Sequence, residues 1–316
     1  MRQTLHDMRS LYCSITLPAD ASLSSACSAV KIKRPTLWLR SVALYERVPM
    51  PAISALHCYP IKSCAGHALT QAELTPRGIR YDREWMVVDD DGVFLSQSSH
   101  PALALVLPAP GENILALSAP DMPDLTIATP NEGDPIGVTV WDYPCEGIDQ
   151  GEEAAQWFKA YLQTSCRLVR MRSSFTRVVD QTYAPRPSDQ VGFADGFPLL
   201  LISEGSLEDL NTRLPARILM NRFRPNLVVT GCAPYAEDEW KTIQINGLTL
   251  EIAKPCGRCA TTTVDQLTGQ KNSDQEPLRT LATYRRHDNL VFFGQNVTYA
   301  ETGALTVGDD LRVIAP

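Results

Sequence analysis

Two cysteines lie in the stretch Lys254-Pro255-Cys256-Gly257-Arg258-Cys259-Ala260-Thr261-Thr262-Thr263-Val264-Asp265, which is followed shortly by Thr268-Gly269. Before it, residues 248–253 alternate apolar and polar side chains, as a half-buried strand does. Residues 261–264 are all β-branched and predict the next strand. The cysteines are therefore expected in a tight connection between two strands, with Arg258 beside Cys259. A neighbouring cation favours the thiolate form of a cysteine, which binds soft metals or attacks electrophiles.

A Cys-x-x-Cys pair has other interpretations. Two buried apolar thiols would look the same in the sequence. A structural zinc site needs four ligands, and no second cysteine pair or His-x-x-x-His follows this one, so tetrahedral zinc is not expected. A thioredoxin-like dithiol begins a helix in a βαβ unit, whereas the residues after Cys259 predict a strand.

Length and composition set broad limits. The chain has 316 residues, enough for two domains, with 44% hydrophobic and 21% charged residues, as in ordinary globular proteins. The net charge of -7 argues against a nucleic-acid polymer as the main partner. No apolar run approaches the roughly 20 residues that span a bilayer, so no membrane association is expected. Nine scattered cysteines, an odd number, favour reduced thiols and a cytoplasmic location.

Residues 1–51 differ from the rest of the chain. They mix Ser, Ala, Arg and Lys without sustained periodicity, and the short apolar run 37–45 is interrupted by Arg40. We expect a disordered leader or a misassigned translation start, with Met50 shortly before an ordinary domain start. A targeting peptide is the less favoured interpretation.

The next part of the chain predicts many short strands separated by Pro and Gly, with a hairpin turn at 89–92. The predicted strands are 52–59, 71–75, 83–89, 93–95, 102–107, 115–118, 125–128 and 136–140. This spacing suggests a barrel or sandwich rather than a doubly wound sheet. Residues 152–162 predict an amphipathic helix, with Ala155, Phe158 and Leu162 on one face.

Strand and helix signals continue after a polar connection at 171–190. Residues 199–202 are wholly apolar and predict a buried strand, after which Ser203 is a good N-cap for a helix to about Leu214. Such a joint leaves backbone N–H groups free to bind an anion, although an ordinary strand–helix joint needs no ligand. Pro225 is expected to favour an extended backbone conformation at Arg224, and residues 227–229 predict another strand.

Several motifs carry a family resemblance. Pro255-Cys256-Gly257-Arg258-Cys259-x-x-Thr262-Thr263-Val264-Asp265 resembles the cysteine motif of the MOSC family, the molybdenum-cofactor sulfurase C-terminal domain. Tyr59-Pro60-Ile61-Lys62-Ser63 and Asp82-Arg83-Glu84-Trp85 are similar to motifs of the β-barrel domain that precedes MOSC in two-domain members, and Phe223-Arg224-Pro225-Asn226 is similar to a further family motif. The resemblance covers about 52–316, with the motifs in family order.

The resemblance implies a mixed α/β, predominantly β fold. A MOSC N-terminal β-barrel domain over 52–172 would pack on a MOSC β-barrel domain with a few helices over 173–316. Two-domain members include the mitochondrial amidoxime-reducing component and bacterial reductases of N-hydroxylated bases. The implied activity is a molybdenum-dependent two-electron reduction of hydroxylamines, amidoximes or N-oxides.

The family pattern also implies site residues. Cys259 would be the catalytic thiolate on molybdenum, in a molybdenum cofactor held between the domains. The implied cofactor-binding residues are Lys62, Ser63, Arg83, Asp195, Gly196, Phe197, Ser203, Arg224, Asn226 and Arg258. Asp265 is a candidate proton donor, or a turn residue before Thr268-Gly269. Ser98 stands where relatives often carry an arginine, and His100 would either replace it or be solvated.

The electron source is expected in another protein. No cysteine follows Cys259, whereas a plant-type iron–sulfur cluster needs four, so no cluster is expected in this chain. A separate ferredoxin or flavin reductase would supply electrons. Two alternatives stay open: a cofactor or sulfur carrier that uses Cys259 without reductive turnover, and a purely structural β domain.

Overall fold

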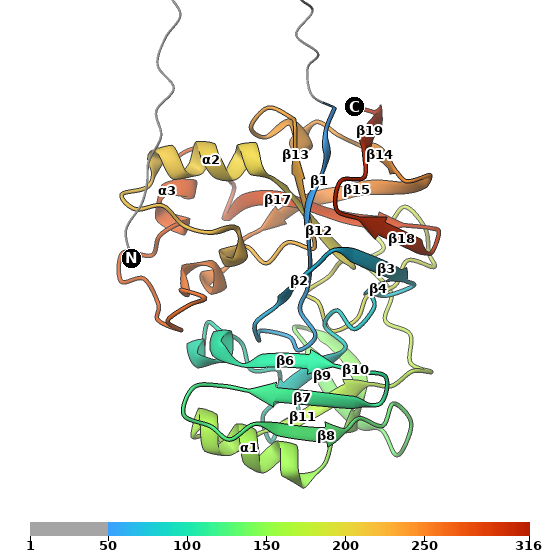
Figure 1. Ribbon diagram of the computed structural model, residues 1–316, viewed down its shortest axis with the longest axis vertical. Helices are drawn as coiled ribbons and strands as arrows, with labels where there is room; N and C mark the ends of the chain where they lie inside the picture. The colour runs from blue at the N-terminus through green and yellow to red at the C-terminus, as the bar shows by residue number, and fades with distance from the viewer. Residues whose placement is uncertain (1–49) are drawn as a thin grey trace, which may run out of the picture. The chain divides into compact units, whose positions relative to one another are not determined.

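The computed structural model describes residues 50–316 (Figure 1), so the predicted leader lies outside the described residues. Strands predominate over three α-helices in this range, which confirms the predominantly β fold. No helix of the described range is long and apolar enough to cross a membrane. The strands are β1 Ala52–Cys58, β2 His67–Leu69, β3 Gln71–Thr75, β4 Gly78–Ile79, β5 Trp85–Val88, β6 Leu107–Pro110, β7 Ile114–Ser118, β8 Leu125–Ala128, β9 Ile136–Val140, β10 Tyr143–Asp149, β11 Arg167–Met171, β12 Leu199–Ser203, β13 Leu227–Thr230, β14 Thr242–Ile245, β15 Leu248–Gly257, β16 Arg286–His287, β17 Leu290–Tyr299, β18 Gly303–Thr306 and β19 Leu311–Ala315.

Short helices connect these strands. The α-helices are α1 Glu152–Leu162, α2 Glu204–Arg213 and α3 Leu278–Ala282, and the 3₁₀ helices are η1 Pro101–Leu105, η2 Met220–Arg222, η3 Ala236–Asp238 and η4 Ala260–Thr263. The predicted helix at 152–162 is confirmed at both ends, with Ala155 and Phe158 buried. Ser203 is the N-cap of α2, as predicted, and its hydroxyl accepts the N–H of Ser206 at 3.0 Å.

The largest sheet has nine strands, in the order β19-β14-β15-β17-β12-β13-β1-β2, with β16 on β17. β12 and β13 are parallel and are joined through α2, whereas the other pairs are antiparallel. All five residues of β12 are buried, which explains the wholly apolar stretch that predicted it. In Figure 1, α2 and α3 lie near each other beside this sheet.

The first strands of the chain pair with its last third. β1 lies between β13 and β2, and β3 pairs with β18, so Leu74 is opposite Gly303. Figure 1 shows the blue β1 running beside β13. The predicted strands at 52–59 and 71–75 are confirmed, but their partners lie far along the sequence, where strand periodicity carries no information.

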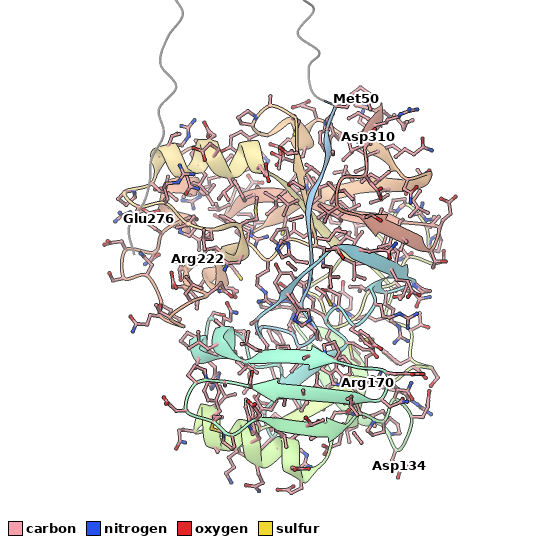
Figure 2. All side chains as sticks on the ribbon, in the orientation of Figure 1. Met50, Asp134, Arg170, Arg222, Glu276 and Asp310 are labelled. Atoms are coloured by element: carbon pink, nitrogen blue, oxygen red, sulfur yellow. The ribbon has the colours of Figure 1, made fainter. Side chains whose placement is uncertain are left out.

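Residues 85–171 form two smaller sheets, β5-β11-β10-β9 and β6-β7-β8, and α1 packs on β11 and β8. Trp85, Leu115 and Phe158 are buried together in this core. Arg170 of β11 (Figure 2) is almost fully buried and ion-pairs with Glu84 at 2.6 Å. Its guanidinium also lies 4.8 Å from the centroid of the Trp85 ring.

Two strand predictions are wrong, and a third, 93–95, forms only isolated bridges with Val88 and Thr139. Residues 102–107 fall mostly in η1, where Pro101 occupies the first turn; the fixed φ and missing N–H of proline suit a helix start. Residues 261–264 fall mostly in η4 rather than in a strand. There the hydroxyls of Thr262 and Thr263 donate to the carbonyls of Cys259 and Ala260, at 3.0 and 2.7 Å. Such local bonds compete with strand pairing despite the β-branched sequence.

Candidate functional site

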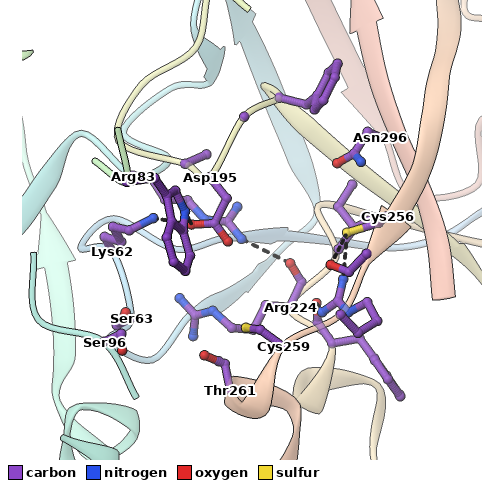
Figure 3. A pocket seen from close by; sticks show the side chains of 18 of the residues that line it. Lys62, Ser63, Arg83, Ser96, Asp195, Arg224, Cys256, Cys259, Thr261 and Asn296 are labelled. Atoms are coloured by element: carbon purple, nitrogen blue, oxygen red, sulfur yellow. Dashed lines mark hydrogen bonds and ion pairs between the residues drawn. The ribbon is translucent and has the colours of Figure 1, made fainter. Parts of the chain in front are cut away.

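A pocket brings together residues from both halves of the described chain (Figure 3). Lys62, Ser63 and Ser96 lie on one side of the view, Cys256 and Asn296 lie on the other, and Cys259 lies near the middle. The predicted site residues that line it are Lys62, Ser63, Arg83, Asp195, Gly196, Phe197, Arg224, Asn226, Arg258 and Cys259. The structure therefore gathers most of the residues chosen from separate sequence motifs.

The cysteine motif follows the end of β15. Cys256 is the second-last residue of that strand and is half-buried, whereas Cys259 precedes η4 and is exposed. Arg258 was expected beside the Cys259 thiol. Its Nη1 instead donates to Cys256 Sγ at 3.0 Å, and its Nη2 donates to the Phe223 carbonyl at 2.7 Å. Arg258 thus ties the motif to the segment that carries Arg224.

Two guanidinium groups lie against one aromatic ring. The Cζ atoms of Arg83 and Arg224 are each 4.3 Å from the centroid of the buried Tyr59 ring. Arg83 ion-pairs with Asp82 at 2.6 Å, whereas no carboxylate of the described residues lies at ion-pair distance from Arg224. Burial and, after it, the nearby charge of Arg83 lower the pKa of Arg224 to about 10. Arg224 Nη2 and Arg258 Nε are buried without a hydrogen-bond partner, so this wall can accept an anion.

Three residues of the pocket have left-handed backbone conformations. Ser63, Arg83 and Arg224 have φ angles of 69, 47 and 58°, so the extended conformation predicted for Arg224 before Pro225 is wrong. Each such residue costs about 1–2 kcal/mol, because its Cβ crowds the backbone. Strained residues that persist together tend to mark functional sites. The left-handed backbone conformation is an observation independent of the sequence motifs, and it occurs at residues that the motifs also identified.

Asp195 joins two parts of the pocket. It ion-pairs with the buried Lys62 and accepts a hydrogen bond from Trp141 Nε1 at 3.1 Å. Burial lowers the pKa of Lys62, and the Asp195 carboxylate opposes that effect. Gly196 and Phe197 continue the lining.

Arg177 positions the loop that carries Asp195. Its buried guanidinium donates to the carbonyls of Gly192, Ala194 and Asp195 at 2.9, 2.6 and 3.0 Å. The sequence analysis missed Arg177 because it lies in a polar connection without a motif. Only its contacts across the fold identify it.

Asn226 and Ser63 are held by the protein itself. The side-chain oxygen of Asn226 accepts from Arg83 Nη1 at 3.1 Å and from the Leu200 N–H at 3.2 Å. Asn226 therefore positions Arg83 in addition to lining the pocket. The Ser63 carbonyl accepts from Gln97 Nε2 at 2.7 Å, and Gln97 is fully buried.

Ser203 is not brought to this pocket. It is fully buried, and its N–H donates to Glu237 Oε1 at 3.0 Å. Ser206 donates to the same oxygen at 2.7 Å. The carboxylate of Glu237 therefore takes the place that an anionic ligand would occupy at the start of α2.

Asp265 and His100 also lie outside the lining. Asp265 Oδ1 accepts the N–H groups of Leu267 and Thr268 at 2.9 and 3.0 Å, and its Oδ2 pairs with Arg222 (Figure 2) at 2.7 Å. Partial burial raises the pKa of Asp265, but these two N–H groups and Arg222 outweigh it and hold the pKa below its usual value. Asp265 thus has the surroundings of a turn residue rather than of a proton donor. Ser98 lines the pocket.

Comparison with known proteins agrees with these features. Residues 50–165 match the MOSC N-terminal beta barrel domain, and residues 188–312 match the MOSC domain. The chain is 38% identical to mitochondrial amidoxime-reducing component 1 of Mus musculus over 83% of this chain and 82% of that protein. It is 35% identical to the Homo sapiens component 1, with the same coverage of both chains. It is 36% identical to mitochondrial amidoxime reducing component 2 of Bos taurus over 81% of each chain. The chain therefore belongs to the MOSC family, as a member with both the N-terminal β-barrel and the MOSC domain.

Proposed function

We propose that this protein reduces N-hydroxylated compounds, namely amidoximes, hydroxylamines and N-oxides, with a molybdenum cofactor and electrons from a separate protein. The observation that carries the proposal is the exposed Cys259 thiol in a pocket with buried, unpaired guanidinium nitrogens. The names of the relatives, amidoxime-reducing components, support the same substrate class.

The residues present fit such a cofactor. Among residues 50–316, no three His, Cys, Asp or Glu side chains gather as a metal site. A metal at Cys259 would therefore take its other ligands from a cofactor, and a thiolate suits a soft metal site. Arg224 and Arg258, which lack carboxylate partners within the described residues, suit the phosphate of a pterin cofactor.

Each residue then has a defined task. Cys259 would be the protein ligand to molybdenum, and Lys62, Arg83, Arg224 and Arg258 would hold the anionic part of the cofactor. Asn226 and Arg177 would position these groups through their bonds to Arg83 and to the Asp195 loop. When bound, the cofactor supplies the two-electron chemistry that converts N–OH to N–H, with uptake of two protons and release of water.

The names of the relatives support a separate electron donor. The relatives are named components, a word that fits one part of a multi-protein system. We infer a ferredoxin or a flavin reductase as the donor class.

The test uses protein purified from a molybdenum-replete host. Reduced viologen replaces the donor, and a panel of amidoximes, hydroxylamines and N-oxides is assayed for the amine product. We expect product with reduced viologen, none with NADH alone, and none with the Cys259→Ala variant. Absence of any Cys259-dependent product would favour the carrier function. Product with NADH alone would contradict the separate donor.

A further inference from the structure

Trp141 occupies an unusual position at the edge of the pocket. It is the first residue of the two-residue turn between β9 and β10, in which Val140 pairs with Tyr143. Its φ is 56°, in the left-handed region where such turns favour glycine or asparagine. A tryptophan here is strained, and strain that persists beside a pocket points to function.

The indole is fixed although it is exposed. Its Nε1 donates to Asp195 Oδ1 at 3.1 Å, and its ring lies edge-on to Phe94, with centroids 5.1 Å apart. Phe94 and Asp195 line the same pocket. Trp141 nevertheless remains 53% exposed, whereas Trp85, Trp157 and Trp240 are all below 10%. A rigid aromatic surface is therefore held open to the solvent at the pocket.

We propose that Trp141 determines specificity by stacking on flat, conjugated N-hydroxylated substrates, so that aryl amidoximes are preferred over alkyl amidoximes. The proposal rests on the proposed function and names the substrate class of that site. An aryl amidoxime is planar through its ring and its N–C=N group, so it can lie along the indole. The reaction takes R–C(=NOH)NH2, two electrons from the donor protein and two protons to R–C(=NH)NH2 and water.

The first test compares benzamidoxime with acetamidoxime, using reduced viologen as the electron source. We expect Trp141→Asn to lower kcat/KM for benzamidoxime about 3- to 10-fold more than kcat/KM for acetamidoxime, as loss of an aromatic contact does. Trp141→Phe should retain most of the preference. The matched control is Ile314→Asn, another exposed apolar residue, which should change neither value. An aryl-to-alkyl ratio in Trp141→Asn equal to that of the wild type overturns the proposal.

Stability separates recognition from a structural role. Asparagine tolerates the left-handed conformation of this turn, so Trp141→Asn should keep its Tm and its molybdenum content. A large fall in Tm, with the aryl-to-alkyl ratio unchanged among folded molecules, would assign Trp141 to the fold and overturn the proposal.

The second test needs no turnover. Benzamidine, a flat product analogue, should quench the tryptophan fluorescence of the wild-type protein, whereas acetamidine should not. The change should be absent in Trp141→Phe, which assigns the signal to this residue. A protein that shows this quenching but reduces nothing would refute the proposed function and keep the Trp141 inference. A reductase without Trp141-dependent quenching, and with an unchanged aryl-to-alkyl ratio, would refute the Trp141 inference and keep the proposed function.

Discussion

The two walls of the pocket differ in how they are built. The wall around Tyr59 is buried, and its Arg83 and Arg224 have left-handed backbone conformations. The wall around Cys259 is exposed and follows the end of β15. The backbone conformations of the first wall cost free energy in the folded protein, and this wall has its shape before any ligand binds. The second wall presents a reactive thiol on which the fold does not depend. Substitutions on the two walls should therefore separate stability from chemistry.

The largest expected effect is at the exposed wall. Cys259→Ala should lose the metal and lower reductase activity more than about 100-fold, because it removes the proposed protein ligand. The Tm of the cofactor-free protein should move by no more than about 3 °C, since the side chain is exposed. Metal analysis measures the metal content, and thermal denaturation measures the Tm. Cys256→Ala is the control and should keep metal and activity; equal metal in wild type and Cys259→Ala would contradict the ligand role.

A second substitution tests the buried wall around Tyr59. Its effects on cofactor retention and on the stability of the cofactor-free protein should have opposite signs. Arg224→Met should reduce cofactor retention about tenfold or more, because a desolvated charge partner is removed. The lowered pKa of Arg224 means that folding penalises its charged form at neutral pH, and that the penalty is relieved only as the pH rises above about 10. The cofactor-free variant should therefore be as stable as the wild type, or more stable by about 1 kcal/mol.

Thermal denaturation of cofactor-free protein, together with its metal content after loading, checks this expectation. Arg312→Met, at an exposed arginine that makes no ion pair within the described residues, is the matched control and should change neither quantity. A Tm several degrees below that of the wild type would show that Arg224 stabilises the fold, and the contrast between the two walls would fail.

The smallest effect concerns Asp265, which lies outside both walls. Asp265→Asn should leave kcat within about twofold and lower the stability by about 1–2 kcal/mol at pH 7, since Arg222 loses its partner. Because the folded-state pKa of Asp265 is lowered, its contribution is present above a pH of about 4 and is lost as the pH falls through the folded value. Denaturation curves of both proteins should thus converge in acid. A kcat that falls tenfold or more would restore the proton-donor role.

Local sequence could predict the pocket cations but not all of their surroundings. Lys62, Arg83 and Arg224 lie in recognisable motifs, and the structure brings them together. Trp141 and Arg177 reach the Asp195 loop from 54 and 18 residues away, so no local pattern reveals them. The β-branched residues after Cys259 were wrongly predicted to form a strand. Their hydroxyls donate to nearby carbonyls, an effect that strand propensity does not include.

The partnership of β3 with β18 has a consequence for synthesis of the protein. Leu74 leaves the ribosome long before Gly303, its partner in the finished sheet. At about 5–20 residues per second, the interval is on the order of ten seconds or more. Throughout that time the nascent β3 lacks one of its two neighbours, and its unpaired edge is open to chaperones and to other chains. Translation must pass β18 before this edge of the fold can close.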